Sequence, residues 1–82
     1  MGDAIKLDHL TRKLEELNTL MRSGELKHGE YDQRLARLIG ELRERKLDAE
    51  RPAIDATMDD LVGRGVITPA VRAHMENKLG LA

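Results

Sequence analysis

The sequence of 82 residues predicts an all-α protein of four helices arranged as two helix-turn-helix hairpins. Its apolar residues are mostly aliphatic, with four methionines, one tyrosine and no phenylalanine or tryptophan, whereas strands are enriched in β-branched and aromatic residues. Apolar residues recur at helical spacing, and their pattern repeats around a helix-ending glycine. We expect one domain over residues 1–82, with a long hairpin at 4–47 and a short one at 53–80.

The first helix is predicted by a stripe of apolar residues that begins at Leu7. Successive positions in the stripe alternate between steps of three and four residues, the heptad spacing of a helix that packs along one face. The pattern stops at Ser23-Gly24, where a glycine can take the left-handed conformation that ends a helix. The stripe consists of Leu7, Leu10, Leu14, Leu17 and Met21.

A second helix should begin near Lys27 or His28 and end near Leu47. Its apolar residues share one face and its charged residues share the other. The connection to the first helix is short, so the two helices must be antiparallel neighbours. The apolar face of the second helix consists of Tyr31, Leu35, Leu38, Ile39 and Leu42.

The segment from Asp48 to Pro52 is the predicted boundary between the hairpins. Proline disfavours the helical conformation in the residue before it and has no backbone N–H to donate. One continuous helix with a kink at Pro52 is the alternative. A third helix then carries Ile54, Met58, Leu61 and Val62.

The turn after the third helix is the clearest local signal in the chain. Gly65 is suited to end the third helix, Thr68 to cap the fourth, and Pro69 to occupy the first position of the fourth. The fourth helix then carries Val71, Met75 and Leu79 and ends at Gly80.

The two hairpins become similar when Gly24 is aligned with Gly65. Apolar residues then match at fixed offsets from the glycine. The apolar residue two positions after each glycine is expected to fold back under the preceding helix and close the corner. The matched pairs are Leu17 with Met58, Leu20 with Leu61, Leu26 with Ile67, and Leu38 with Leu79.

In the first hairpin the pattern comprises Leu14, Leu17, Leu20, Gly24, Leu26, Glu30, Tyr31, Leu38 and Ile39. It resembles the SHOCT domain, a short helical hairpin usually found at the C-terminus of bacterial and phage proteins. The second hairpin matches this family from Gly65 to Thr68 but has Arg72 at the aromatic position. The first hairpin departs from it at Lys27, where the family has a capping Thr, and at Gly29, among acidic positions. The resemblance implies a docking or oligomerisation module without enzyme activity.

Composition and charge argue against several classes of protein. Fourteen basic and fifteen acidic residues give a net charge of −1, which does not suit a protein that binds nucleic acid mainly by neutralising phosphates. The absence of cysteine excludes a thiolate nucleophile, a disulfide scaffold and a thiolate zinc site. The sequence has no apolar run long enough to span a membrane, and its N-terminus lacks the layout of a signal peptide. We therefore expect a cytoplasmic protein.

No pattern of residues predicts an active site or a metal site. His9, His28 and His74 are far apart in the sequence and have no metal-ligand spacing, so we interpret them as surface residues. The pairs Glu15-Glu16 and Asp59-Asp60 are neighbours on helices, where adjacent side chains diverge by about 100° and are poorly placed to share a substrate. We predict no catalytic residue, no metal and no cofactor.

A series of basic residues keeps nucleic-acid binding open as a minor alternative. The turn at Thr68-Pro69 also resembles the start of a recognition helix. Acidic residues are interleaved with the basic ones, however, and interleaved charges are typical of an exposed helix face. The basic series consists of Arg34, Arg37, Arg43, Arg45, Lys46 and Arg51.

The function that the sequence predicts is a non-enzymatic protein-protein interaction module that self-associates and docks on a protein partner. From the helical rise, the second hairpin is too short to cover the apolar stripes of the first, and exposed leucines favour association. We expect a homodimer in which two copies form a helical bundle. A stand-alone regulator or inhibitor of a larger enzyme, bacterial or phage-encoded, is the alternative, followed by a small DNA-binding regulator. The expected dimer seam consists of Leu7, Leu10, Leu14, Leu17, Met21, Tyr31, Leu35, Leu38 and Leu42.

Overall fold

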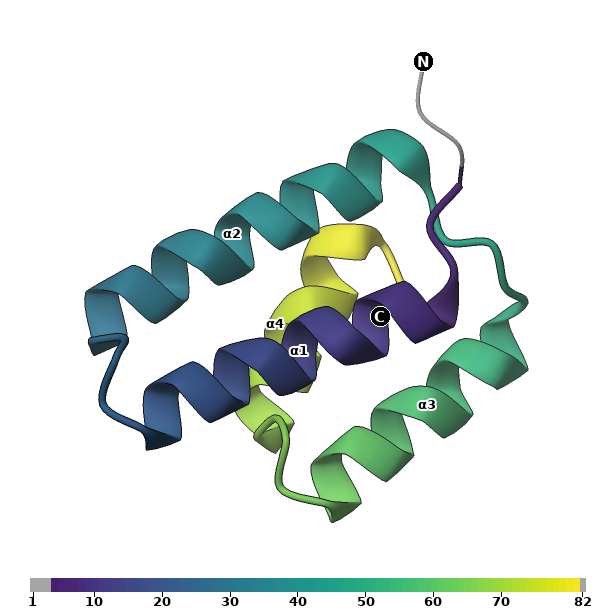
Figure 1. The fold of residues 1–82 in the computed structure, drawn as a ribbon. Coiled ribbons are helices and arrows are strands. Elements are labelled where there is room, and N and C mark those ends of the chain that lie inside the picture. The colour runs from purple at the N-terminus through teal and green to yellow at the C-terminus, as the bar shows by residue number, and fades with distance from the viewer. Residues whose placement is uncertain (1–3, 82) are drawn as a thin grey trace.

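The computed structural model describes residues 4–81, which form four helices (Figure 1). The predicted all-α fold is confirmed. The connection between the second and third helices is not helical, so the alternative of one continuous helix kinked at Pro52 is wrong. The helices are α1 (Leu7–Arg22), α2 (His28–Arg45), α3 (Arg51–Gly63) and α4 (Pro69–Leu79).

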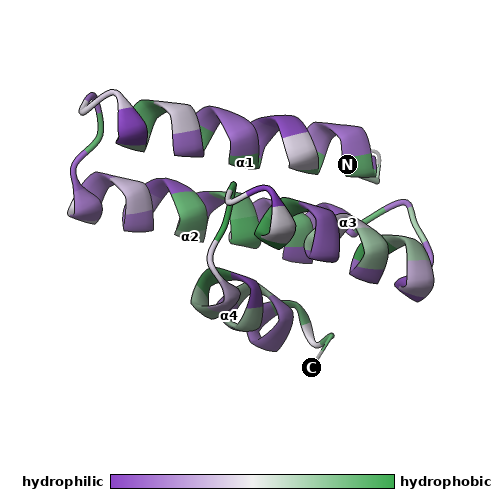
Figure 2. Ribbon diagram, turned by 90° about the horizontal axis from the view of Figure 1, so that it is seen from below, coloured by the Kyte–Doolittle hydropathy of each residue, from purple (hydrophilic) through white to green (hydrophobic). Residues whose placement is uncertain are grey.

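The two hairpins pack against each other so that each short helix covers a long one. Helices α1 and α2 are antiparallel neighbours, α3 packs against α1, and α4 packs against both α2 and α3. Figure 2 shows α1 and α4 on opposite sides of the molecule, with α2 and α3 between them. The apolar faces of all four helices therefore point into one shared core.

The predicted repeat is visible in the backbone of the two hairpin corners. Gly24 and Gly65 both have positive φ, at +82° and +77°. The Leu26 amide donates to the Leu20 carbonyl, and the Ile67 amide donates to the Leu61 carbonyl. In each corner the donor lies two positions after the glycine, and the acceptor lies four positions before the glycine. The residue directly after each glycine donates to the same carbonyl, and the glycine amide donates to the carbonyl of Met21 or Val62; these two bonds form a Schellman motif at the end of each helix.

The start of α4 follows the predicted capping scheme. The Thr68 hydroxyl accepts a hydrogen bond from the Val71 amide at 3.1 Å, and Pro69 occupies the first turn, where its missing N–H is not needed. Helix α2 starts differently, because Lys27 stands where a capping oxygen is preferred. There the Glu30 carboxylate accepts a hydrogen bond from the Lys27 amide at 3.2 Å.

The end of α2 differs from the sequence prediction. The helix ends at Arg45, and Leu47, expected to finish it, forms a short parallel bridge with Ile5. The Ile5 amide donates to the Lys46 carbonyl at 2.8 Å, and the Asp48 amide donates to the Ile5 carbonyl at 2.7 Å. These two bonds fasten the segment before α1 to the α2–α3 connection and place the Ile5 side chain, which is 2% exposed, in the core.

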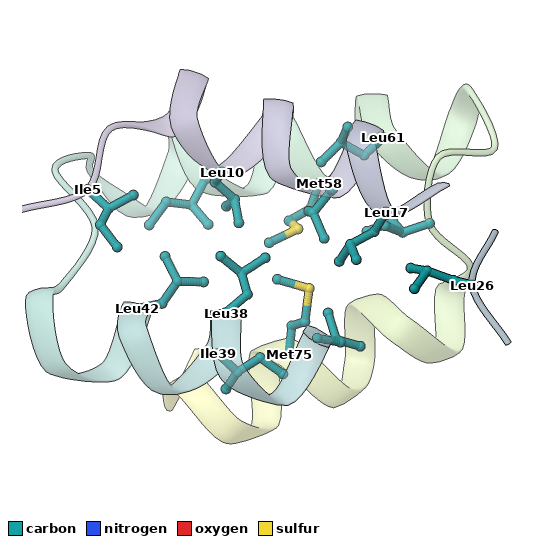
Figure 3. Close-up of a cluster of buried hydrophobic side chains, with 14 residues drawn as sticks. Ile5, Leu10, Leu17, Leu26, Leu38, Ile39, Leu42, Met58, Leu61 and Met75 are labelled. Atoms are coloured by element: carbon teal, nitrogen blue, oxygen red, sulfur yellow. The ribbon is translucent and has the colours of Figure 1, made fainter. Parts of the chain in front are cut away.

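Most residues of the expected dimer seam are buried within a single chain (Figure 3). Residues outside the helices supply further cover: Leu26 lies at one end of the long hairpin, while Ile5 lies at the other. Of the predicted seam, only Leu7, Met21 and Tyr31 are half-buried. The expected seam residues that are buried in the core are Leu10, Leu14, Leu17, Leu35, Leu38 and Leu42.

Candidate protein-docking groove

An open groove lies where the end of α2, the start of α3 and the end of α4 meet, and we call it the corner groove. Its volume is about 950 Å³. The wall on α2 runs from Gly40 to Lys46, and the α2–α3 connection continues it to Arg51 and Ile54. The segment from Lys78 to Leu81 forms the opposite side. Three segments that are distant in the sequence therefore build one concave surface.

The floor of the corner groove is apolar. Within residues 4–81, every Leu, Ile, Val, Met and Tyr is buried or half-buried, so no large apolar side chain stands fully in solvent. Several of the half-buried ones gather in this groove. Its apolar lining consists of Leu42, Leu47, Ala49, Ile54, Leu79 and Leu81.

The charges around the corner groove are mostly positive. Four cations line it, whereas Glu44 is the one carboxylate in the lining. Arg51 has its Nε atom 3.9 Å from Asp55 Oδ1, a distance typical of a weak surface pair. The other three cations form no ion pair within the described residues, and they are exposed. The four cations are Arg43, Lys46, Arg51 and Lys78.

The other arginines of the second hairpin are held by carboxylates. Arg64 Nη1 donates to Glu15 Oε2 at 2.9 Å, and its Nε donates to Asp60 Oδ2 at 2.9 Å. Arg72 donates to Asp59. The hydrogen bond to Glu15 is the main cause of the raised pKa of Arg64, and the bond to Asp59 is the main cause of the raised pKa of Arg72. These cations serve internal ion pairs, whereas those of the corner groove remain available for a ligand.

Gly40 is an unusual residue for its position in the wall of the groove. It lies inside α2, where glycine costs about 0.5–1 kcal/mol relative to alanine. A Cβ atom built on Gly40 would meet no atom within 4 Å. The packing of this chain therefore gives no reason for glycine there. The two other glycines within helices lie at helix ends, Gly29 in the first turn of α2 and Gly63 as the last residue of α3.

Lys46 is the reverse case, a residue other than glycine in a backbone conformation that favours glycine. Its backbone has φ +70° and ψ +155°, a region that is populated almost only by glycine. Helices α1, α3 and α4 are each followed by a glycine with positive φ, namely Gly24, Gly65 and Gly80. Among residues 4–81, Lys46 is the one residue other than glycine with positive φ. Lysine thus stands at the groove where the backbone favours glycine.

The basic series seen in the sequence is divided by the fold. Arg43, Lys46 and Arg51 line the corner groove, whereas Arg34 and Arg37 line a smaller groove of about 180 Å³ between α1 and α2. That smaller groove also contains two carboxylates, so its charge is more balanced. The resemblance of α4 to a recognition helix is weakened as well, because its Arg72 is engaged by Asp59 and the helix packs on α2 and α3.

The residues considered for chemistry do not come together in the part of the chain that the structure describes. His9, His28 and His74 are all exposed. Within residues 4–81 no group of three His, Cys, Asp or Glu residues is placed to hold a metal ion. The nearest ionic contact of a histidine is between His9 Nε2 and Glu41 Oε1, at 4.0 Å. The predicted corner residues, in contrast, take the positions expected of them.

Sequence reasoning missed the corner groove, although one signal was present. The signal is Gly40, which lies among good helix formers although glycine there costs about 1 kcal/mol relative to alanine. The conformation of Lys46 and the approach of Leu79 and Leu81 to α2 depend on tertiary structure, and no local pattern announces them.

No helix in the described residues is long and apolar enough to cross a membrane. Comparisons with protein-family models, with curated proteins and with solved structures found no significant match. The resemblance to the SHOCT domain therefore stays a prediction that rests on the residues named above.

Proposed function

We propose that this chain is a non-enzymatic protein-binding module that docks on a larger protein through the corner groove. The observation that carries the proposal is the groove itself: an open apolar concavity of about 950 Å³, rimmed by cations, in which several half-buried apolar side chains gather. Concave apolar surfaces with a few placed polar groups are the usual form of binding sites. This surface fits a docking or regulatory role, and we propose that the protein acts in the cytoplasm.

Docking on a different protein is favoured over self-association by the burial of the expected seam. Leu14 is fully buried within one chain, and Leu35 is only 5% exposed. A second copy would not gain apolar contacts from these residues without unfolding the first. This burial argues for a foreign partner, and the groove offers a surface for a foreign chain.

The experiment is a selection of displayed random peptides on the purified protein, followed by affinity measurements with the synthetic peptides. A Gly40→Trp variant fills the groove wall from a helical position with open space around it. Gly29→Trp is the matched control, because Gly29 lies on the same helix with equally open surroundings and does not line the groove. Both variants replace a helical glycine by a better helix former, so both should keep the fold.

We expect peptides whose affinity falls by about tenfold or more in Gly40→Trp, which is a loss of about 1.4 kcal/mol, and stays unchanged in Gly29→Trp. If no peptide is enriched, or if both variants bind the enriched peptides equally well, the corner groove is not a docking site and the proposal is refuted.

A further inference from the structure

We propose that the corner groove binds an apolar peptide segment that carries carboxylates and that packs closely against the α2 backbone at Gly40. This inference rests on the proposed docking function and names the chemistry of the partner. Three features support it: the excess of cations on the rim, the helical glycine in the wall, and the strained backbone of Lys46, which is one of these cations.

The charge of the rim selects for an anionic partner. Four cations face one carboxylate around an apolar floor, and Arg43, Lys46 and Lys78 have no ion-pair partner among the described residues. Complementary charges across an interface increase the association rate and exclude wrong partners. Aspartate and glutamate side chains next to apolar residues therefore match the groove, whereas a purely apolar segment would leave the cations without partners.

Gly40 and Lys46 both break a local preference, and both line the same groove. Alanine at position 40 would stabilise the helix, and glycine at position 46 would relieve the backbone. Local rules are broken mainly at functional sites, where another requirement outweighs stability. A bare backbone at Gly40 allows close approach of a partner chain, and the Lys46 ammonium supplies a charge that glycine could not.

A second copy of this chain is a poor occupant of the groove. The exposed surface within residues 4–81 presents no Leu, Ile, Val, Met or Tyr that is free to insert into the floor. The occupant we infer is therefore a segment of a different protein.

The test uses the peptides selected on the wild-type protein that lose affinity in Gly40→Trp and keep it in Gly29→Trp. We expect these peptides to combine apolar residues with Asp or Glu. Replacing their carboxylates by the matching amides should lower affinity by about twofold to fivefold for each contact with a cation. The affinity of the acidic peptides should also fall as salt is raised, since salt screens exposed charges.

Variants of the protein provide the second arm. Lys46→Gly should lower the affinity for the acidic peptides by about twofold to fivefold while raising the melting temperature. Gly40→Ala should also raise the melting temperature and lower the affinity, because its methyl group stands between the helix backbone and the ligand. A variant that only damaged the fold would lower both quantities together, so the opposite signs separate binding from folding.

The outcomes separate this inference from the docking function. Groove-dependent peptides without carboxylates, with affinities insensitive to salt and to Lys46→Gly, would overturn the acidic partner and leave the docking function intact. The absence of any groove-dependent peptide would overturn both. A duplex DNA, or vesicles containing an anionic phospholipid, that bound more tightly than the peptides and lost binding in Gly40→Trp would also overturn the acidic peptide as the ligand.

Discussion

Replacing Lys46 by glycine should make the protein more stable, even though the change removes a side chain from the surface. The lysine backbone has φ +70° and ψ +155°. A residue other than glycine in such a region costs about 1–3 kcal/mol, because its Cβ atom crowds the adjacent carbonyl groups. The surroundings impose this conformation on Lys46, since its carbonyl is fixed by the Ile5 amide and its own amide is bonded to the Leu42 carbonyl.

The expected gain is smaller than the strain itself. Glycine loses about 0.5–1 kcal/mol more backbone entropy on folding than other residues do. The net stabilisation from Lys46→Gly is therefore about 1 kcal/mol, which corresponds to a rise in melting temperature of about 4–8 °C for a domain of this size. Thermal and urea unfolding followed by circular dichroism would measure both the melting temperature and the free energy of unfolding.

Lys46→Ala is the matched control. Alanine removes the ammonium group but keeps the Cβ atom, so the strain remains and the free energy of unfolding should change by less than about 0.5 kcal/mol. If alanine raises the stability as much as glycine does, the effect comes from the removed charge. If glycine lowers the stability, Lys46 is not strained, and this support for a functional lysine disappears.

Four further predictions concern the corners, the tyrosine, metal ions and the association state. Thr68→Ala should lower the free energy of unfolding by about 1 kcal/mol, because the hydrogen bond from the Val71 amide is lost. Gly65→Val should lower it by more, because φ is +77° there. Unchanged melting temperatures for both variants would refute the assigned corner. Burial, aided by the charge of Asp32, raises the pKa of Tyr31. The contribution of the neutral tyrosine to stability is therefore complete below the unfolded pKa of about 10 and is lost as the pH rises through the pKa of the folded protein. Phenolate absorbance should appear at higher pH in the native protein than in guanidinium chloride. Zinc, nickel and a chelator should each leave the melting curve unchanged, and a stoichiometric shift would contradict our interpretation of the histidines. Leu14→Glu should unfold the chain by burying an unpaired charge. The wild type should sediment as a monomer with a melting temperature independent of concentration. A melting temperature that rises with protein concentration would support the homodimer instead.

The helices and corners could be predicted because their determinants are local. The left-handed conformation at Gly65, the cap at Thr68 and the proline at position 69 each depend on a few neighbouring residues. The same is true of Gly24, and the agreement between the two corners explains why the repeat was recognisable. Patterns of this kind are decided within about one turn of helix, so the sequence carries them without tertiary information.

The end of α2 could not be predicted because contacts from outside the helix decide it. The pattern of apolar residues runs on to Leu47, and nothing in it marks Arg45 as the last helical residue. The helix ends because Ile5 pairs with Leu47 through two backbone hydrogen bonds. The partner is distant in the sequence, and a single apolar residue near the N-terminus is no signal of such pairing.

The argument for a dimer seam rested on an incomplete picture of how the chain builds a core from helices of unequal length. Comparing the lengths of the two hairpins assumes that only helices cover helices. Each short helix instead covers one long helix, α3 on α1 and α4 on α2. The remaining ends of the long hairpin are covered by Leu26 from one corner and by Ile5 from the segment before α1.

The same arrangement leaves the corner groove open. The chain after α4 turns back at Gly80, and Leu81 lies half-buried beside the end of α2. The described chain has no further element to cover Leu47 and Ala49, so these residues stay half-buried at the floor. The core residues contributed by the corners and by the segment before α1 therefore leave an apolar surface partly uncovered at the end of the molecule where Gly40 and Lys46 lie. This is the location at which an acidic, apolar segment of another protein would complete the packing.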